Sequence, residues 1–387
     1  MSKLFNFTLL LIIMFLASSC EEQPVQSVHQ TFYVGGYTLE EFNASGKGIY
    51  TCSLNTESGE MTLENIFENS INPSYITIHP NGKYLYAANE IGGKTPGYVS
   101  SFRIKEDGQL EFINEKYTGG DYPCYISISS DNKYLLVANY GGGSVTVFPL
   151  LENGEIDNKS SLIKHSGKGP FEERQEAAHA HYFGSGINDS TAFAIDLGTD
   201  RIFHYRIKSN GRLGVKSATK VTEGTGPRHL VFHPTLKVCY VILEFTNQIE
   251  AFKFNDEYTP FEKIQSIYTV GKPLPFYAAT SSAIKIHPSG KYLYAGNRGI
   301  PDATEDNIAM FSINPDDGTL FYLGNMDTKG KVPRDFEIDP TGNFLIVANQ
   351  ETNNLVSFKI DQETGKLTPT GFELAIGTAT CIKFMRS

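Results

Sequence analysis

Ionisable residues of different types occupy matching places near the ends of repeated sequence segments. Four of them combine proton-accepting and cationic groups: His181, Glu244, Arg228 and Arg298. Histidine and glutamate can take a proton from water, and arginine binds carboxylates, phosphates and developing oxyanions through paired N–H donors. Four further residues at matching places are candidates for substrate binding: His229, Arg334, Asp335 and Glu90. The set predicts acid–base chemistry on a carbonyl or anionic ligand.

Other catalytic patterns are missing from the sequence. It contains neither a G-x-S-x-G nucleophile elbow nor a Walker loop. His179 and His181 are two residues apart and would face the same way on a strand, but no carboxylate cluster accompanies them at ligand spacing. The sequence therefore predicts neither a metal site nor a cofactor.

The candidate residues belong to a repeat that runs through the chain. In each unit an alternating segment, a turn and a second alternating segment follow one another, as in residues 75–89, YITIHPNGKYLYAAN. Three of the turns read Pro-Asn-Gly, Pro-Ser-Gly and Pro-Thr-Gly, which is hairpin chemistry. The units end at Asn89, Asn139, Asp196, Leu243, Asn297 and Asn349.

A third alternating segment follows in the units, and a fourth often follows a D-G or T-G turn such as Asp107-Gly108. A seventh copy is split, because residues 31–36 match a second strand and residues 381–384 match a first strand. No segment shows sustained helical periodicity. The sequence therefore predicts an all-β fold over residues 31–387. The expected architecture is a seven-bladed β-propeller with four antiparallel strands per blade, closed by pairing of its N- and C-terminal strands.

Equivalent positions of the units predict which side chains meet at one mouth of the central channel. The start of each first strand and the end of each second strand lie at the same edge, because the two strands are antiparallel. The first strands are expected to place on the channel face Tyr75, Tyr125, His181, His229, Ala283, Asp335 and Cys381. The rim residues just before them are Ser74, Cys124, Ala180, Arg228, Ser282, Arg334 and Thr380. The residues that follow the second strands are Tyr37, Glu90, Tyr140, Leu197, Glu244, Arg298 and Gln350.

Residue types at these positions differ from blade to blade, which is typical of a site built on a symmetric scaffold. The alternative is a set of rim ion pairs that hold the blades in register.

Several stretches also resemble a known family. Residues 226–234 (GPRHLVFHP), 178–183 (AHAHYF) and 332–350 (VPRDFEIDPTGNFLIVANQ) are similar to signature stretches of the seven-bladed lactonase propellers. That family includes bacterial 6-phosphogluconolactonases and the fungal carboxy-muconate lactonising enzyme. The resemblance runs from about residue 31 to residue 386 and implies the same propeller fold.

The resemblance also implies roles, because His181, Arg228, Glu244 and Arg298 match the residues proposed as active in the muconate enzyme. Glu244 or His181 would be the base, and Arg228 and Arg298 would bind an anionic group and stabilise the oxyanion. The implied reaction is hydrolysis of a sugar lactone, 6-phosphogluconolactone or a related aldonolactone, to the open sugar acid. The same groups also suit the reverse reaction, a lactone-forming cyclase. Ala283 stands where the family commonly has an acidic residue. A non-catalytic propeller that binds a ligand or a protein is therefore an alternative.

The N-terminus has the pattern of an export signal. Lys3 precedes an apolar run over residues 9–16, and small residues 17–19 lead into Cys20. We expect a lipoprotein-type signal peptide over residues 1–19, a lipid anchor on Cys20 and a flexible tether over residues 20–30. The protein would then be exported to the bacterial cell envelope, periplasm or outer membrane, and touch the membrane only through that lipid. The alternative is an ordinary signal peptide in which Cys20 is incidental.

The composition argues against one class of binding partner. The formal net charge of −10 argues against nucleic acid as a partner, since phosphate backbones need clustered Lys and Arg. The remaining cysteines lie far apart with no C-x-x-C spacing and are expected to be buried free thiols: Cys52, Cys124, Cys239 and Cys381.

Overall fold

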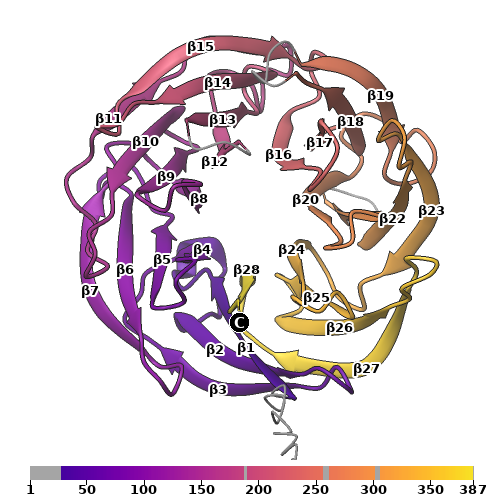
Figure 1. The fold of residues 1–387 in the computed structure, drawn as a ribbon, viewed down its shortest axis with the longest axis horizontal. Coiled ribbons are helices and arrows are strands. Elements are labelled where there is room, and N and C mark those ends of the chain that lie inside the picture. The colour runs from indigo at the N-terminus through magenta and orange to yellow at the C-terminus, as the bar shows by residue number, and fades with distance from the viewer. Residues whose placement is uncertain (1–27, 187–189, 256–260, 301–305, 387) are drawn as a thin grey trace, which may run out of the picture.

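The chain forms a ring of seven sheets, each with four antiparallel strands (Figure 1). The computed structural model describes residues 28–186, 190–255, 261–300 and 306–386. Within these ranges the single helical element is a short 3-10 turn, η1 (Glu40–Phe42). The predicted seven-bladed β-propeller is therefore confirmed. The expected signal peptide, Cys20 and residues 21–27 of the tether lie outside the described residues.

The strands follow one another in chain order around the ring. The first blade contains β1 (His29–Gly36), β2 (Ile49–Asn55), β3 (Met61–Phe67) and, from the C-terminus, β28 (Ala379–Phe384). The second contains β4 (Pro73–Ile78), β5 (Tyr84–Asn89), β6 (Tyr98–Ile104) and β7 (Leu110–Tyr117). The third contains β8 (Pro123–Ile128), β9 (Tyr134–Asn139), β10 (Ser144–Pro149) and β11 (Ser161–Lys164).

The fourth blade contains β12 (Ala180–Ser185), β13 (Thr191–Asp196), β14 (Arg201–Ile207) and β15 (Leu213–Lys220). The fifth contains β16 (Pro227–Phe232), β17 (Val238–Leu243), β18 (Gln248–Lys253) and β19 (Glu262–Tyr268). The sixth contains β20 (Thr280–Ile286), β21 (Tyr292–Arg298), β22 (Asn307–Ile313) and β23 (Leu320–Asp327). The seventh contains β24 (Pro333–Ile338), β25 (Phe344–Asn349), β26 (Asn354–Ile360) and β27 (Leu367–Ala375).

The two ends of the chain close the ring, as the split repeat predicts. In Figure 1 the C-terminal strand β28 lies at the centre beside β1, and Val34 pairs with Ile382 across this seam. Strand β1 begins earlier than expected, because His29 already pairs with Asn55 of β2. The predicted tether over residues 20–30 is therefore too long by two residues at its C-terminal end.

The predicted turns join first and second strands as their chemistry requires. The amide of Gly82 donates to the carbonyl of His79 at 2.8 Å, and Gly82 has a positive φ of 70°. Gly290 and Gly342 repeat this geometry in other blades. In the third blade Asn132 takes the same place with a φ of 62°, since asparagine tolerates this region better than most residues.

Tyrosine and glycine, both frequent in this chain, meet between neighbouring blades. The buried hydroxyl of Tyr86 donates to the carbonyl of Gly154 at 3.2 Å, one blade further on. Tyr33, Tyr240 and Tyr294 make the same bond from second strands to turn glycines of the next blade. Each bond satisfies a buried hydroxyl, which contributes about 1 kcal/mol.

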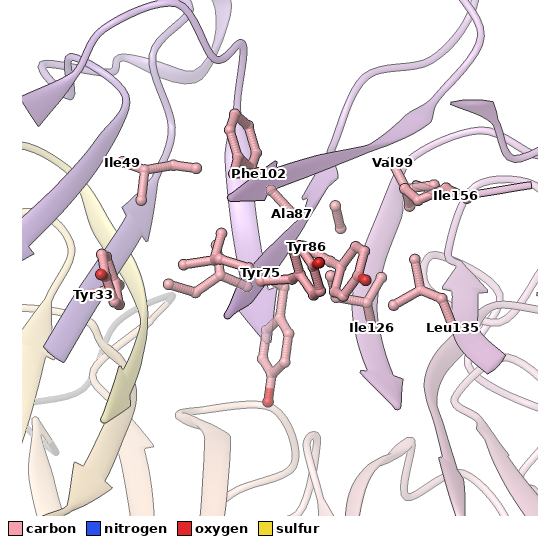
Figure 2. Close-up of a cluster of buried hydrophobic side chains, with 14 of the residues drawn as sticks. Tyr33, Ile49, Tyr75, Tyr86, Ala87, Val99, Phe102, Ile126, Leu135 and Ile156 are labelled. Atoms are coloured by element: carbon pink, nitrogen blue, oxygen red, sulfur yellow. The ribbon is translucent and has the colours of Figure 1, made fainter. Parts of the chain in front are cut away.

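Apolar side chains fill the space between blades. Figure 2 shows one such cluster, which extends from Tyr33 and Ile49 of the first blade to Ile126 and Leu135 of the third. The four cysteines of the described chain are buried free thiols, as expected: Cys52, Cys124, Cys239 and Cys381. No described helix is both long and apolar enough to cross a membrane.

Candidate active site

A β-bulge at the start of the first strands shapes one mouth of the channel. The register shifts between Pro227 and His229 of β16, so Arg228 has no partner on β17. A bulge lets two consecutive side chains point the same way, which ordinary strand alternation forbids. Arg228 Nη1 accordingly lies 3.2 Å from Nε2 of its neighbour His229, inside the channel. Equivalent single-residue bulges occur at Ser74, Cys124, His181 and Arg334.

The bulges correct the position that the repeat predicts for His181. In β12 the register shifts between Ala180 and Tyr182, so His181 is the bulged residue. It is therefore equivalent to Arg228, whereas Tyr182 is equivalent to His229. The expectation that His181 and His229 share one position is wrong by one residue, because Tyr182, and not His181, pairs with the next-to-last residue of its second strand as His229 does.

Glu244 is the anion around which the mouth is organised. It directly follows β17 and is almost fully buried, at 4% exposure. Its Oε2 lies 3.1 Å from Nε of Arg228 and 3.2 Å from Nη2 of Arg298. Its Oε1 lies 2.9 Å from Nη2 of Arg174. The structure thus brings three of the four candidate catalytic residues into direct contact.

Local backbone structure places Arg228 and Glu244 together. The amide of Glu244 donates to the carbonyl of Gly226 at 2.7 Å. Gly226 has a φ of 63°, and a Cβ there would lie 2.4 Å from the ring of Phe245, so both the conformation and the packing require glycine. The carboxylate of Asp200 accepts from the amides of Gly224 and Gly226 at 2.7 and 3.0 Å.

Backbone carbonyls satisfy the other ends of the two arginines. Arg228 Nη1 donates to the carbonyl of Ser282 at 2.7 Å, and Arg298 Nη2 donates to that of Ser281 at 2.9 Å. The neighbouring Ala283 is fully buried in an apolar cluster that includes Tyr294 and Phe336. Both arginines therefore have acceptors without a carboxylate at Ala283.

The charges of this cluster do not balance. Burial raises the pKa of Glu244, but Arg298, Arg174 and Arg228 overcome this effect and hold that pKa well below its usual range. Burial lowers the pKa of Arg228, and it lowers the pKa of Arg298 to about 10 in spite of Glu244. One carboxylate shared by three guanidinium groups leaves an excess of positive charge, which favours a second anion at the mouth.

His181 is the proton acceptor with an available nitrogen. Its Nδ1 is buried and has no hydrogen-bond partner among the described residues. Burial, followed by the charge of Arg228, lowers its pKa well below the usual value, so the ring is neutral. The imidazole packs edge-on against Tyr140 and His229, with ring centroids 5.7 and 5.3 Å away.

Arg334 and Glu90 form a second charged pair at the same mouth. Arg334 Nη2 donates to the hydroxyl of Tyr37 at 2.7 Å and lies 3.8 Å from Oε2 of Glu90. Arg334 lines a small cavity together with Arg228, His229 and Cys124. Among the described ion pairs, Arg334 contacts Glu90 and not Glu244.

Asp335 and His229 lie deeper in the channel. Asp335 faces Lys285 and Lys383, at 3.8 and 4.0 Å, and both lysines also contact Glu337. His229 packs against the rings of Tyr75, Tyr125 and Tyr182. Burial lowers the pKa of His229, so it is neutral and its Nε2 accepts from Arg228.

A cavity of about 890 Å³ opens at the opposite end of the channel. Its lining includes Thr77, Ser127, Glu337 and Lys383 but neither His181 nor any of the arginines around Glu244. The four candidate catalytic residues thus lie at the bulged mouth and not beside this wider space.

Comparison of the repeats misses one member of the cluster. Arg174 belongs to residues 165–179, which connect β11 to β12 and match no part of the repeat. The signal that could find it is the length of this connection, because long loops between blades carry functional residues more often than tight ones.

Within the described residues, no group of three His, Cys, Asp or Glu side chains is placed to hold a metal ion.

The fold matches that of known proteins. The family model described as "Lactonase, 7-bladed beta-propeller" matches residues 31–384. The chain belongs to this lactonase family. A 6-phosphogluconolactonase of Bacillus subtilis (strain 168) is 36% identical to it over 355 residues, or 91% of this chain and 97% of the relative.

Solved structures agree with this membership. A putative 6-phosphogluconolactonase from Bacteroides fragilis is 34% identical, with a TM-score of 0.85 over 94% of this lactonase and 100% of that chain. A periplasmic gluconolactonase from Pseudomonas aeruginosa is 27% identical, with a TM-score of 0.83 over 92% and 99% of the two chains. The protein is therefore an enzyme of the lactone-hydrolase class.

Proposed function

We propose that this lactonase opens a sugar lactone at the bulged mouth of its channel. The observation that carries the proposal is the excess of guanidinium groups around Glu244 beside a neutral His181 with an unpartnered Nδ1. A lactone carbonyl develops negative charge when water attacks it, and buried cationic donors stabilise that charge.

Each step of the proposed reaction has a group in this mouth. Water attacks the lactone carbonyl carbon while His181 Nδ1 accepts its proton, and Arg228 and Arg298 stabilise the tetrahedral oxyanion. The ring C–O bond then breaks, and the imidazolium returns the proton to the departing alkoxide oxygen. One water is consumed and one hydroxy acid is formed.

Glu244 has a different role in this proposal. Both of its carboxylate oxygens are occupied by guanidinium groups, which stabilise its anionic form. It acts as a positioning residue that holds the arginines close together in spite of their mutual repulsion. Nδ1 of His181 has no partner among the described residues, so the choice between Glu244 and His181, which the resemblance leaves open, favours His181 as the base.

The substrate we propose is 6-phosphogluconolactone or a related aldonolactone. Two relatives named 6-phosphogluconolactonase, from Bacillus subtilis and Formosa agariphila, are each 36% identical to this chain. The Pseudomonas relative is named for gluconolactone and for the periplasm. If the chain is exported, the unphosphorylated lactone is the substrate that it would meet.

We also propose export and lipid anchoring at Cys20, on the pattern of residues 1–20. The test is fatty-acid labelling of the full chain in a bacterial host, with Cys20→Ala as the matched variant. Label and membrane association are expected in the parent and not in Cys20→Ala. Equal labelling of the two chains would refute the anchor.

A lactone panel assay tests the proposed activity. Loss of gluconolactone and of 6-phosphogluconolactone is followed with the purified chain, with Arg228→Ala and with Arg103→Ala as the control. Arg103 is a surface arginine, with a side chain 53% exposed. We expect turnover well above buffer for the parent and the control, and a loss of about 100-fold or more in Arg228→Ala. The proposal is wrong if the parent does not exceed buffer on either lactone, or if Arg228→Ala equals the control.

A further inference from the structure

Two long connections meet over the active-site mouth. Residues 165–179 lie between β11 and β12, and residues 269–279 lie between β19 and β20. Arg174 of the first connection donates to the hydroxyl of Tyr277 in the second at 2.6 Å. The guanidinium carbon of Arg174 also lies 5.1 Å from the ring centre of Phe245. These contacts hold the guanidinium of Arg174 beside Glu244, although Arg174 belongs to a connection and not to a blade strand.

The backbone around Arg174 is held firmly. Gln175 is fully buried, and its Nε2 donates to the carbonyl of Leu197 at 2.8 Å in the next blade. The amides of Arg174 and Gln175 both donate to the carbonyl of Phe171, at 3.0 and 2.7 Å. A loop anchored in this way presents its guanidinium in one orientation, so little entropy is lost when a ligand binds.

Arg174 is the most exposed arginine of the cluster around Glu244. Its side chain is 28% exposed, whereas the side chains of Arg228 and Arg298 are 3% and 6% exposed. Its Nη1 contacts Tyr277, and its Nη2 contacts Tyr140 and Glu244. A guanidinium has five N–H donors, so these three bonds leave donors for an incoming acceptor.

The charge of the mouth favours an anionic acceptor. Arg174, Arg228 and Arg298 share the single carboxylate of Glu244. Two further acids nearby contact other groups: Glu90 lies 3.8 Å from Arg334, and Glu176 lies 2.9 Å from His179. A planar guanidinium with donors to spare matches the oxygens of a phosphate or a carboxylate.

We propose that Arg174 is the anion-recognition residue of this lactonase, a loop-borne guanidinium that binds an oxyanion of the ligand. The proposal rests on the proposed lactone hydrolysis, and it names an anionic group of the ligand as the feature that the site recognises. The oxyanion has two sources, the phosphate group of a phosphorylated sugar lactone or the carboxylate of the sugar acid product.

Calorimetric titration with two sugar acids tests this role and distinguishes the sources. The probes are gluconate, which carries a carboxylate, and 6-phosphogluconate, which carries a phosphate as well. The proteins are the full chain, Arg174→Gln, Arg174→Lys and the exposed control Arg103→Gln. In Arg174→Gln we expect binding of at least one acid to weaken about 10- to 100-fold. The affinity of Arg174→Lys is expected to lie between those of the parent and Arg174→Gln, because lysine keeps the positive charge but lacks the planar, paired N–H donors.

The pattern of loss identifies the oxyanion. A loss confined to 6-phosphogluconate assigns Arg174 to the phosphate, and equal losses for both acids assign it to the carboxylate. The proposal is overturned if Arg174→Gln weakens neither acid more than about threefold beyond Arg103→Gln, or if the parent binds neither acid. Tyr277→Phe is the milder variant if Arg174→Gln does not fold. It removes the hydroxyl that holds Nη1, and it is expected to weaken the same acid about three- to tenfold.

The outcome for Arg174 can be separated from the outcome for the activity. A parent that binds a sugar acid through Arg174 but hydrolyses no lactone refutes the proposed function alone. A parent that hydrolyses lactones while Arg174→Gln binds both acids normally refutes the role of Arg174 alone.

Discussion

Removing the charge of Glu244 should destabilise the whole protein, because three guanidinium groups depend on this carboxylate. Glu244→Gln keeps the shape of the side chain and leaves Arg174, Arg228 and Arg298 facing a neutral amide at 2.9 to 3.2 Å. Loss of one partner from a buried ion pair costs about 3–5 kcal/mol. An unfolding entropy of about 2.1 cal/mol/K per residue gives about 0.75 kcal/mol/K for a propeller of this size, so Tm should fall by about 4–7 °C.

Thermal unfolding in a buffer of low anion content measures this effect. Glu111→Gln is the matched control, since the Glu111 carboxylate lies 3.7 Å from Arg103 in a pair whose side chains are both more than half exposed, and should cost less than about 2 °C. Added sulfate should then raise the Tm of Glu244→Gln more than that of the parent, because the ion replaces the missing charge. If Glu244→Gln and Glu111→Gln unfold at the same temperature and respond equally to sulfate, the electrostatic account of the mouth is wrong.

Other consequences of the structure can be measured in solution. The pKa values of His181 and His229 are lowered in the folded state, so the unfolded chain binds more protons as pH falls below about 6.5. As the pH falls, the free energy of unfolding measured in urea titrations should therefore drop by up to about 1.4 kcal/mol per pH unit for each ring. Replacing both histidines with Gln should flatten this slope. A parent protein that gains stability between about pH 6.5 and 5.5 would contradict the predicted sign. Phe32 is fully buried in the seam, 5.2 Å from the ring of Phe384, so Phe32→Ala should cost about 3–5 kcal/mol in the same assay. A cost below about 1 kcal/mol would mean that the seam contributes little to the stability of the ring.

The architecture could be predicted from the sequence because its signals are local. Turns such as the one ending at Gly82 and the alternation of the flanking strands depend on neighbouring residues only. The same signals recur in every blade, so the split copy at the chain ends identifies the seam that Val34 and Ile382 close.

The candidate site could be predicted only in part, for two physical reasons. The segment after the first strand of the fourth blade lacks the Pro-x-Gly sequence that aligns other units, so His181 was compared with His229 although it lies one place earlier. Arg174 comes from a connection outside the repeat, so no comparison between blades could place it beside Glu244. Glu244, Arg228 and Arg298 meet as the repeat predicts, because they lie at strand ends that the ring brings to one edge.

The pairing of β1 with β28 also determines the order in which the ring is completed during synthesis. The first blade is the first to leave the ribosome, yet its innermost strand is among the last segments to be made. Until β28 emerges, the inner edge of β1 has no partner, and Ile76 of the second blade lacks the Cys381 thiol that accepts from its amide. Ring closure therefore has to wait for translation to reach β28. The ring thus stays open through most of the synthesis of the chain.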